Sequence, residues 1–460
     1  MPSQPSPPPV LDRLDPLEAP AFDRRRAWTV TALIVTFMII NFADKSVLGL
    51  AAGPIMRELD ISHGTYGLIS SSYSVLFSLS GLLVGFFSSR ISSRVLLFVM
   101  CLVWGVAQLP VLIVAAVPAL VVGRVLLGAA EGPATPMSMH ALYKWFPAGR
   151  RGLPSALQIS GAALGTLVAA PLVTWLITSF GWRSAFAALA VVSVAWSAVW
   201  WFLGHDGPYD RTQQRSADAA RAEPEARGRV PYRRLLLCGT VIGSVASAFG
   251  AQWAMTLSQA WLPSYLQTEM AMSPGAAAST LSTVSGLSFL LLLALSPAVD
   301  RLTRRGVSSR WSTGVPQGVA VLCAGTAMAL IPLAAPGAGR IALIAIAFGA
   351  HSIAFPLHYM TAAAVAPGAQ RGALFGIVAA TGTLPALLAP SLTGRFLDSA
   401  ASSGAGYARS FALASAVMIV CGLVAVLLIR PARDAARLAA FRQAEPSGAG
   451  TSGPGKPLAQ

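Results

Sequence analysis

Two pairs of charged residues stand among residues that are almost all apolar. Asp44 and Lys45 are adjacent in NFADKSVLGL, and Arg124 and Glu131 are seven positions apart in GRVLLGAAEGP. A charge inside a membrane-spanning segment is costly and is by default a functional hypothesis. Two acids beside two bases suit proton-coupled movement of an anion, because protonating an acid frees its basic partner for a substrate carboxylate. A static ion-pair network is the alternative, although buried pairs are weak stabilisers.

The segments that carry these charges are long enough to span a membrane. The chain is 55% hydrophobic and 11% charged, with a mean hydropathy of +0.63, whereas soluble domains are about 25% charged. Helices are predicted, because barrel strands would be about ten residues with strict alternation. About twelve mostly apolar runs each reach the roughly 18 residues that cross a bilayer: 28–52, 65–88, 95–116, 119–142, 153–178, 184–203, 235–262, 275–298, 312–334, 340–362, 372–394 and 408–429.

Helix geometry predicts the depth of each charge. With a rise of ~1.5 Å per residue, Asp44 lies roughly 12 Å below the outer end of its segment, Arg124 roughly 8 Å and Glu131 roughly 18 Å. Asp44 and Arg124 therefore share a depth and can pair if the first and fourth segments touch. Arg124, Gly128 and Glu131 share one helix face, which we expect to line a cavity.

Basic residues are concentrated on one side of the predicted membrane. With the N-terminus inside, cytoplasmic segments hold about 26 of the 33 Lys and Arg residues, as the positive-inside rule requires. This predicts an even number of spans with both termini cytoplasmic. The net charge of +15 then reflects topology, with lipid attraction as a secondary effect, and nucleic acid is not a predicted partner. The Pro-rich start does not resemble a signal peptide.

A polar stretch rich in Arg, Glu, Asp and Ala divides the spans into two groups of six, and we interpret it as a cytoplasmic linker. Short basic turns recur after the second and eighth spans, as expected of a transporter built from repeats. The predicted parts are a disordered cytoplasmic N-terminal tail (1–27), a six-helix bundle (28–203), the linker (204–234), a second six-helix bundle (235–430) and a cytoplasmic C-terminal tail (431–460).

Uncharged polar side chains provide further candidates in the second half. His351 and His358 are seven positions apart, and so are Gln252 and Gln259. Histidine suits a proton relay, with packing or gating as the alternative for this pair. The glutamines suit substrate hydroxyls, with hydrogen bonds between helices as the alternative. Trp261, near the outer end of its span, is predicted to be an interfacial anchor.

No enzymatic constellation is present in the sequence. There is no nucleotide-binding loop and no nucleophile elbow, and the four cysteines fall in four different spans with no metal-ligand or disulfide spacing. The chain is therefore predicted to be no enzyme and to use no cofactor and no metal. An ion gradient, or the gradient of the solute itself, must drive transport.

Several strings in the first half and the seventh span resemble the major facilitator superfamily, specifically its anion:cation symporter branch of sialin, hexuronate, glucarate, galactonate and phthalate transporters. They are NFADKSVLGLA, GRVLLGAAEGPATPMSMHALYKWFPAGRRG, GWRSAF, PYRRLL and WLPSYL. The resemblance implies an all-α integral membrane protein with twelve transmembrane helices, in two six-helix bundles that rock about a central cavity. It also implies that the protein works as a monomer.

The resemblance also implies residue roles. The family pattern Asn-Tyr-x-Asp-Arg reads here from Asn41 to Lys45, and its Arg and Glu in the fourth span match Arg124 and Glu131. Proton coupling is thus assigned to Asp44 and Glu131. Lysine is a point charge rather than a fork, which disfavours bidentate carboxylate binding. The predicted substrate-binding set is Lys45, Arg124, Asn41, Tyr73, Gln252, Gln259, His351 and His358.

The turns expected to gate the transporter depart from the family pattern. The turn after the second span keeps Gly85, Arg90 and Arg94 but has Ser89 and Ser92 where the family has Asp and Gly. Its counterpart after the eighth span keeps Asp300 and Arg301. Positions that are polar in sugar-acid members are occupied here by Phe77, Gly81, Ala379 and Thr383, which favours a small or aromatic carboxylate over a polyhydroxy sugar acid.

The sequence is compatible with three functions. The leading one is a proton-coupled importer of a small organic anion, a multi-pass protein of the bacterial inner membrane. The second is a proton-coupled exporter of a drug or metabolite on the same fold; Lys45 beside Asp44 favours an anionic ligand over the cation such an exporter would take. The third is a transporter-like sensor, which is disfavoured because the C-terminal tail offers no signalling domain.

Overall fold

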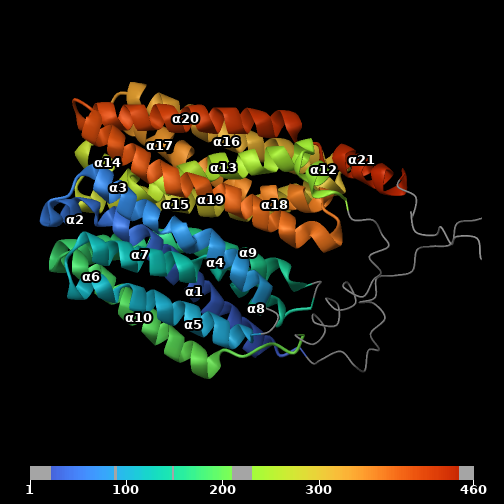
Figure 1. Ribbon diagram of the computed structural model, residues 1–460, viewed down its shortest axis with the longest axis horizontal. Coiled ribbons are helices and arrows are strands. Elements are labelled where there is room, and N and C mark those ends of the chain that lie inside the picture. The colour runs from blue at the N-terminus through green and yellow to red at the C-terminus, as the bar shows by residue number, and fades with distance from the viewer. Residues whose placement is uncertain (1–21, 88–90, 148–149, 210–229, 445–460) are drawn as a thin grey trace, which may run out of the picture. The chain divides into compact units, whose positions relative to one another are not determined.

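The computed structural model describes residues 22–87, 91–147, 150–209 and 230–444. Within these ranges the chain forms helices joined by turns and has no strand (Figure 1). The prediction of an all-helical protein is confirmed. Most of the predicted N-terminal tail, the middle of the predicted linker and the end of the predicted C-terminal tail lie outside the described residues.

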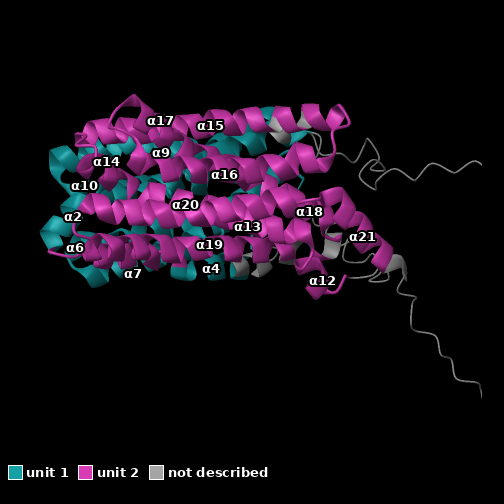
Figure 2. Ribbon diagram, turned by 90° about the horizontal axis from the view of Figure 1, so that it is seen from above, with its two compact units in different colours: residues 1–59, 75–219 teal, residues 60–74, 220–460 magenta. Residues whose placement is uncertain are grey.

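The chain divides into two compact units. Unit 1 comprises residues 1–59 and 75–219, and unit 2 comprises residues 60–74 and 220–460 (Figure 2). The predicted bundles 28–203 and 235–430 stay a prediction. The observed division differs from them in one respect, because residues 60–74 from the first half of the sequence belong to unit 2.

Unit 1 contains the helices of the first half except α3. Several predicted spans are built from two consecutive helices, separated by one or a few residues. The helices are α1 (Arg24–Leu50), α2 (Ala52–Leu59), α4 (Ser74–Phe87), α5 (Ser93–Ala107), α6 (Leu109–Ile113), α7 (Val117–Glu131), α8 (Ala134–Tyr143), α9 (Gly152–Phe180) and α10 (Trp182–Leu203).

Unit 2 contains α3 and the helices of the second half. Among its described residues are one π-helix and two short 3-10 helices, labelled η. Its elements are α3 (His63–Ser72), α12 (Tyr232–Leu236), α13 (Gly239–Ala260), α14 (Leu262–Thr268), α15 (Pro274–Arg304), η3 (Arg310–Gly314), α16 (Val315–Leu330), η4 (Ile331–Leu333), α17 (Ala338–Gly349), η5 (Ala350–Ile353), α18 (Ala354–Val365), α19 (Gly368–Ser399), α20 (Ser403–Leu428) and α21 (Pro431–Ala444).

Among the described residues, ten helical segments are long and apolar enough to cross a membrane. The other two predicted spans are also helical. One is divided into α3 and α4 at Tyr73, and the other contains α13, whose 22 residues include many Gly, Ser and Thr. Large apolar side chains such as Phe202, Leu290 and Val420 are exposed, as expected of surfaces that face lipid.

Proline lies at several of the breaks within spans. Pro110 follows the junction of α5 and α6, and Pro133 lies between α7 and α8. Pro316 cannot donate a hydrogen bond to the carbonyl four residues before it, and the preceding turn is the π-helix η3. Such π-turns often lie at functional sites.

Within unit 2, α3 packs tightly on α19. A side chain at Gly67 would overlap the carbonyl group of Pro390, and one at Gly394 would overlap that of His63. Asp398 of α19 accepts hydrogen bonds from the backbone N–H groups of His63 (3.0 Å) and Gly64 (2.7 Å) at the start of α3. Glycine at these two positions therefore lets the backbones approach closely.

Both chain segments that flank residues 210–229 are held by hydrogen bonds. In unit 1 the backbone N–H of Tyr209 donates to the carbonyl of Lys144 at 3.0 Å. In unit 2 the side chain of Gln370 accepts from the N–H of Val230 (3.0 Å) and donates to its carbonyl (2.7 Å). Each unit thus fixes its own end of the connecting chain.

Candidate functional site

Helix α1 places three of the predicted site residues on consecutive turns. Asn41 and Asp44 are fully buried, and the side chain of Lys45 is 9% exposed. Lys45 Nζ donates to Asn41 Oδ1 at 2.8 Å, because residues four apart are neighbours on a helix. Most of α1 from Phe37 onward is buried, so this polar group lies inside unit 1.

Lys45 joins α1 to the end of α7. Its Nζ lies 3.5 Å from Glu131 Oε2, and the Glu131 side chain has no exposed surface. The ammonium also lies 4.2 Å from the centroid of the Phe42 ring and 5.5 Å from that of Phe77. Lys45 is thus held by an amide, a carboxylate and two aromatic faces.

Asp44 is bound by neutral and cationic donors. Gln108 Nε2 donates to Asp44 Oδ1 at 3.0 Å, and a guanidinium N–H of Arg124 donates to the Asp44 backbone carbonyl at 3.4 Å. The second carboxylate oxygen, Oδ2, has no hydrogen-bond partner among the described residues. The first and fourth segments therefore touch at Asp44 and Arg124, through the backbone carbonyl of Asp44, and an ion pair between the two side chains stays a prediction.

Close backbone packing positions this group of residues. A side chain at Gly132, directly after Glu131, would overlap the carbonyl of Phe77, so α4 contacts the junction of α7 and α8 through main chain. Helix α9 also packs closely on α1, because a Cβ at Gly165 would lie 2.8 Å from the Ile39 carbonyl oxygen and from Phe42 Cβ. These contacts fix the helices that carry Phe77, Glu131 and Lys45.

Sequence reasoning missed Gln108 and the role of Phe77 as a wall. Gln108 is 4% exposed and stands where α5 ends and α6 begins. A polar residue within an apolar run, two residues before Pro110, is a signal that would have found it. The sequence marks Phe77 only as an apolar residue at a position that is polar in sugar-acid transporters, whereas in the structure its ring packs on Lys45.

The remaining substrate-binding candidates lie in unit 2. Tyr73 stands at the break between α3 and α4. Gln252 and Gln259 are half-buried on α13, where Gln252 donates to Thr256 Oγ1 at 3.4 Å. The structure does not test their predicted roles, so these stay predictions.

His351 and His358 are buried on η5 and α18, with 4% and 3% of their surface exposed. The ring of Phe355 lies between them, 6.0 Å and 6.1 Å away. The Nδ1 atoms of both histidines have no hydrogen-bond partner among the described residues. Apolar packing thus surrounds the pair, and a proton-relay role stays a prediction.

Trp261 differs from its prediction. Its side chain is 1% exposed, and its Nε1 donates to the carbonyl of Pro390 at 3.1 Å. The ring packs edge-on against Tyr66, with 5.0 Å between centroids. The prediction of an interfacial anchor is wrong, because the tight packing of α3 on α19 encloses the indole.

The predicted gating residues are described only in part. Arg90 lies outside the described residues, and Gly85 and Asp300 lie near the ends of α4 and α15. Arg94 donates to the backbone carbonyl of Trp201, and its guanidinium carbon lies 4.8 Å from the centroid of the Trp201 ring. Arg301 is exposed in the last turn of α15. A gating role for these residues stays a prediction.

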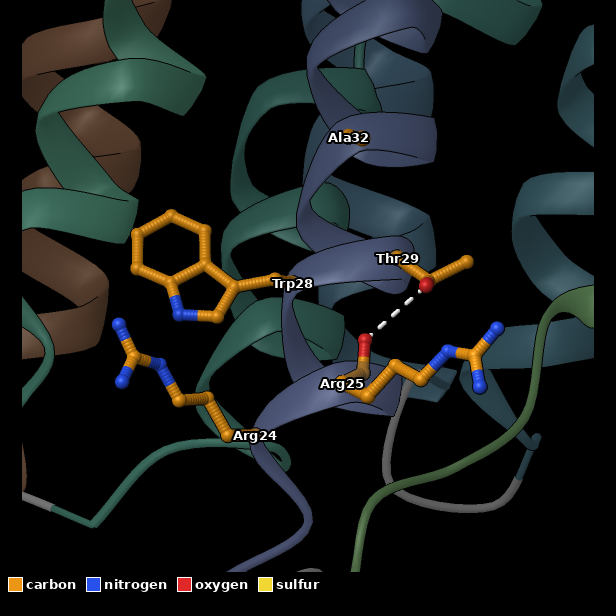
Figure 3. A pocket seen from close by; sticks show the side chains of 5 residues that line it. All are labelled: Arg24, Arg25, Trp28, Thr29 and Ala32. Carbon is orange, nitrogen blue, oxygen red and sulfur yellow. Dashed lines mark hydrogen bonds between the residues drawn. The ribbon is translucent and has the colours of Figure 1, made fainter.

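An open pocket of about 620 Å³ lies at the start of α1 (Figure 3). Arg24 and Trp28 extend to one side of the helix and Arg25 and Thr29 to the other. Thr29 is 15 residues before Asp44, roughly 22 Å along a helix, so this pocket is separate from the buried charges. No group of three or more His, Cys, Asp or Glu side chains in the described ranges is placed to hold a metal ion.

The family model of the Major Facilitator Superfamily matches residues 34–390. The chain belongs to this superfamily. It is therefore a multi-pass membrane protein and a secondary transporter, not an enzyme.

Two curated relatives are similar over nearly the whole chain. One is the hexuronate transporter of Bacillus subtilis, 24% identical over 85% of this chain and 92% of the relative. The other is the D-galactonate transporter of Escherichia coli, 25% identical over 90% of this chain and 98% of the relative. The crystal structure of a D-xylose-proton symporter shares the fold with a TM-score of 0.71, at 15% identity, over 88% of this chain and 99% of that one.

Proposed function

We propose that the chain is a proton-coupled symporter that takes up a small organic anion bearing a carboxylate. The buried contact between Lys45 and Glu131, directly beside Asp44, carries the proposal. Such a group is costly to bury and stabilises the fold poorly, so a functional role explains its presence best. Both curated relatives are named for transporting sugar acids, which are carboxylates.

The contacts suggest how a proton is exchanged for substrate binding. Lys45 Nζ is held by Glu131 Oε2 and Asn41 Oδ1. Protonating Glu131 removes its negative charge and weakens its hold on the ammonium, which then binds a substrate carboxylate. Asp44, whose Oδ2 has no hydrogen-bond partner among the described residues, is the second acid that takes up or passes on a proton.

The walls beside Lys45 favour a compact or aromatic acid. Phe42 and Phe77 flank its ammonium, so a substrate carboxylate bound there adjoins aromatic faces rather than a row of hydroxyl partners. Rings stack on such faces, whereas a polyhydroxy chain would lose hydrogen bonds to water there.

We further propose that the transporter lies in the bacterial inner membrane as a monomer, with both termini in the cytoplasm.

Proton uptake into liposomes tests this function. Purified protein is reconstituted, and internal pH is followed with a dye while sugar acids, aromatic acids and small carboxylates are offered. We expect acid-specific proton uptake by the wild type and its loss in Asp44→Asn and Glu131→Gln. Glu58→Gln is the matched control, because Glu58 is a partly exposed carboxylate on α2 away from the buried group.

Two results would contradict the proposal. Uptake of a labelled acid without proton movement, unchanged in the two variants, would make the buried charges structural. Proton-driven efflux of a cation with no response to any acid would instead indicate an exporter. Either result is interpretable only if uptake by the Glu58→Gln control matches uptake by the wild type.

A further inference from the structure

A second pocket, of about 610 Å³, lies within unit 2 where α15 and α18 end. The π-helix η3 contacts both of these helices and contributes Ser312 and Thr313 to the lining (Figure 2 shows α15 and α18). It involves none of the residues assigned above to substrate or proton. Its chemistry therefore needs a separate explanation.

Several residues that line this pocket are polar. Arg304 contributes a guanidinium group, and Thr303, Ser309 and Ser312 contribute hydroxyl groups. Thr313 also lines it, but its hydroxyl donates to the carbonyl of Ser309 at 2.7 Å. A guanidinium beside several hydroxyl donors matches the oxygens of a phosphate group.

The other residues that line the pocket are apolar. They are Val299, Val307, Met360 and Ala364, and Met360 is 47% exposed on a helix that is long and apolar enough to lie in lipid. A free anion in water gains nothing from apolar lining residues. A phosphate attached to an acyl chain contacts both the polar and the apolar ones.

The surroundings indicate the depth of the headgroup region. Residues 300–310 contain four arginines and a single acid, Asp300. Trp311, on η3, is 60% exposed, and the guanidinium of Arg310 lies 6.0 Å from its ring. Exposed tryptophan beside arginine at the end of a span is typical of the membrane interface, and basic pockets between spans bind lipid headgroups.

We propose that this pocket binds the phosphate headgroup of an anionic phospholipid, with Arg304 and the hydroxyls on the phosphate and an acyl chain along Val299, Val307 and Met360. The binding rests on unit 2 alone and is independent of the substrate proposed above. It places a lipid where α15, η3 and α18 meet, and occupancy ties these three ends together.

Retention of lipid by the purified full-length protein tests the proposal. Native mass spectrometry after incubation with phosphatidylglycerol or phosphatidylcholine measures the lipid bound. We expect phosphatidylglycerol to be retained at least about 5-fold more than phosphatidylcholine, and we expect Arg304→Gln to abolish the preference. Arg305→Gln is the matched control, because Arg305 is the neighbouring exposed arginine and does not line the pocket. A second variant, Ser309→Ala, is expected to weaken retention several-fold.

Three outcomes would overturn the lipid site. Equal loss in Arg304→Gln and Arg305→Gln would indicate diffuse attraction to the arginines. Equal retention of both lipids would remove the role of charge. A free phosphate site would show as protection from thermal unfolding by millimolar inorganic phosphate that depends on Arg304, without preferential lipid retention. Because binding is read directly, a failure of transport activity leaves each of these results interpretable.

Discussion

At the scale of single residues, the buried charges of unit 1 depend on one another. Lys45 contacts Glu131 and Asn41, and Asp44 accepts from Gln108. In a low-dielectric interior, each such contact offsets the cost of taking a charge out of water. Changing one residue therefore alters the electrostatics of its neighbours, which makes paired substitutions more informative than single ones.

Lys45→Met is expected to destabilise the protein by up to about 3–5 kcal/mol, because it removes the ammonium opposite a buried carboxylate. The double variant Lys45→Met with Glu131→Gln is expected to regain most of this loss, while transport stays absent in both. Thermal unfolding in detergent and liposome uptake measure the two effects. If Lys45→Met and the double variant unfold at the same temperature, the 3.5 Å contact between Lys45 and Glu131 does not contribute to stability.

Gln108→Leu is expected to lower both stability, by about 1–3 kcal/mol, and uptake. The reason is that the Asp44 carboxylate loses the donor at 3.0 Å. In an Asp44→Asn background the same substitution should cost less stability, and the difference in thermal unfolding measures the coupling. Strictly additive effects would mean that the two side chains act independently.

The sequence predicted the charged group well because each member violates the apolar pattern of its segment. Asp44, Lys45, Arg124 and Glu131 were all found in this way. Gln108 was not, because a neutral amide in an apolar run carries a weaker signal than a charge. The flanking ring of Phe77 was beyond prediction, because its contact with Lys45 depends on how closely α4 approaches α7 and α8.

At the scale of helices, α2 is tied to the start of α10 by an ion pair. Arg183 Nη2 lies 2.6 Å from Glu58 Oε1, and Trp182 Nε1 donates to Oε2 at 2.6 Å. These hydrogen bonds lower the pKa of Glu58 from its ordinary value. A carboxyl whose pKa is lower in the folded protein stabilises it above the unfolded pKa, and this is lost as pH falls through the folded pKa.

Glu58→Ala is therefore expected to melt below the wild type at neutral pH, by at most about 2 °C because the pair is partly exposed. The difference should shrink once the pH falls below the ordinary pKa of 4.5 and should vanish below the folded pKa. Thermal unfolding from pH 7 downward measures it. A difference that does not change with pH would show that lost packing, rather than charge, is responsible.

The contact of α3 with α19 depends on two glycines. Gly67→Val and Gly394→Val are each expected to destabilise the protein by about 1–3 kcal/mol or more, because the new side chain meets main chain. Gly275→Ala is the matched control, since nothing lies within 4 Å of a Cβ placed there. Thermal unfolding compares the three, and a normal melting temperature for both valine variants would show that the helices separate at little cost.

Helix positions were predictable because the apolar runs are long, but their interruptions were not. The run 65–88 gave no indication that it divides at Tyr73 or that its first part belongs to unit 2. Tertiary packing of Gly67 against Pro390 decides that assignment. For the same reason Trp261 looked interfacial in the sequence and is enclosed in the fold.

At the scale of the whole molecule, the charge distribution predicts which side of the membrane each end occupies. A green fluorescent protein fused after Gln460 should fluoresce in bacteria, because it folds in the cytoplasm. Alkaline phosphatase fused at the same position should be inactive, because it folds only outside the cytoplasm. The opposite pattern would contradict cytoplasmic termini and reverse the positive-inside assignment.

The hydrogen bonds that flank residues 210–229 have a consequence for how the transporter can be built. Tyr209 is fastened to Lys144 in unit 1, and Val230 is fastened to Gln370 in unit 2. A break in the chain between these anchors leaves both attachments intact. We therefore expect that the gene can be divided there and the two halves expressed as separate polypeptides, which lets each half be labelled alone, with α3 of the first half still packing on α19 of the second.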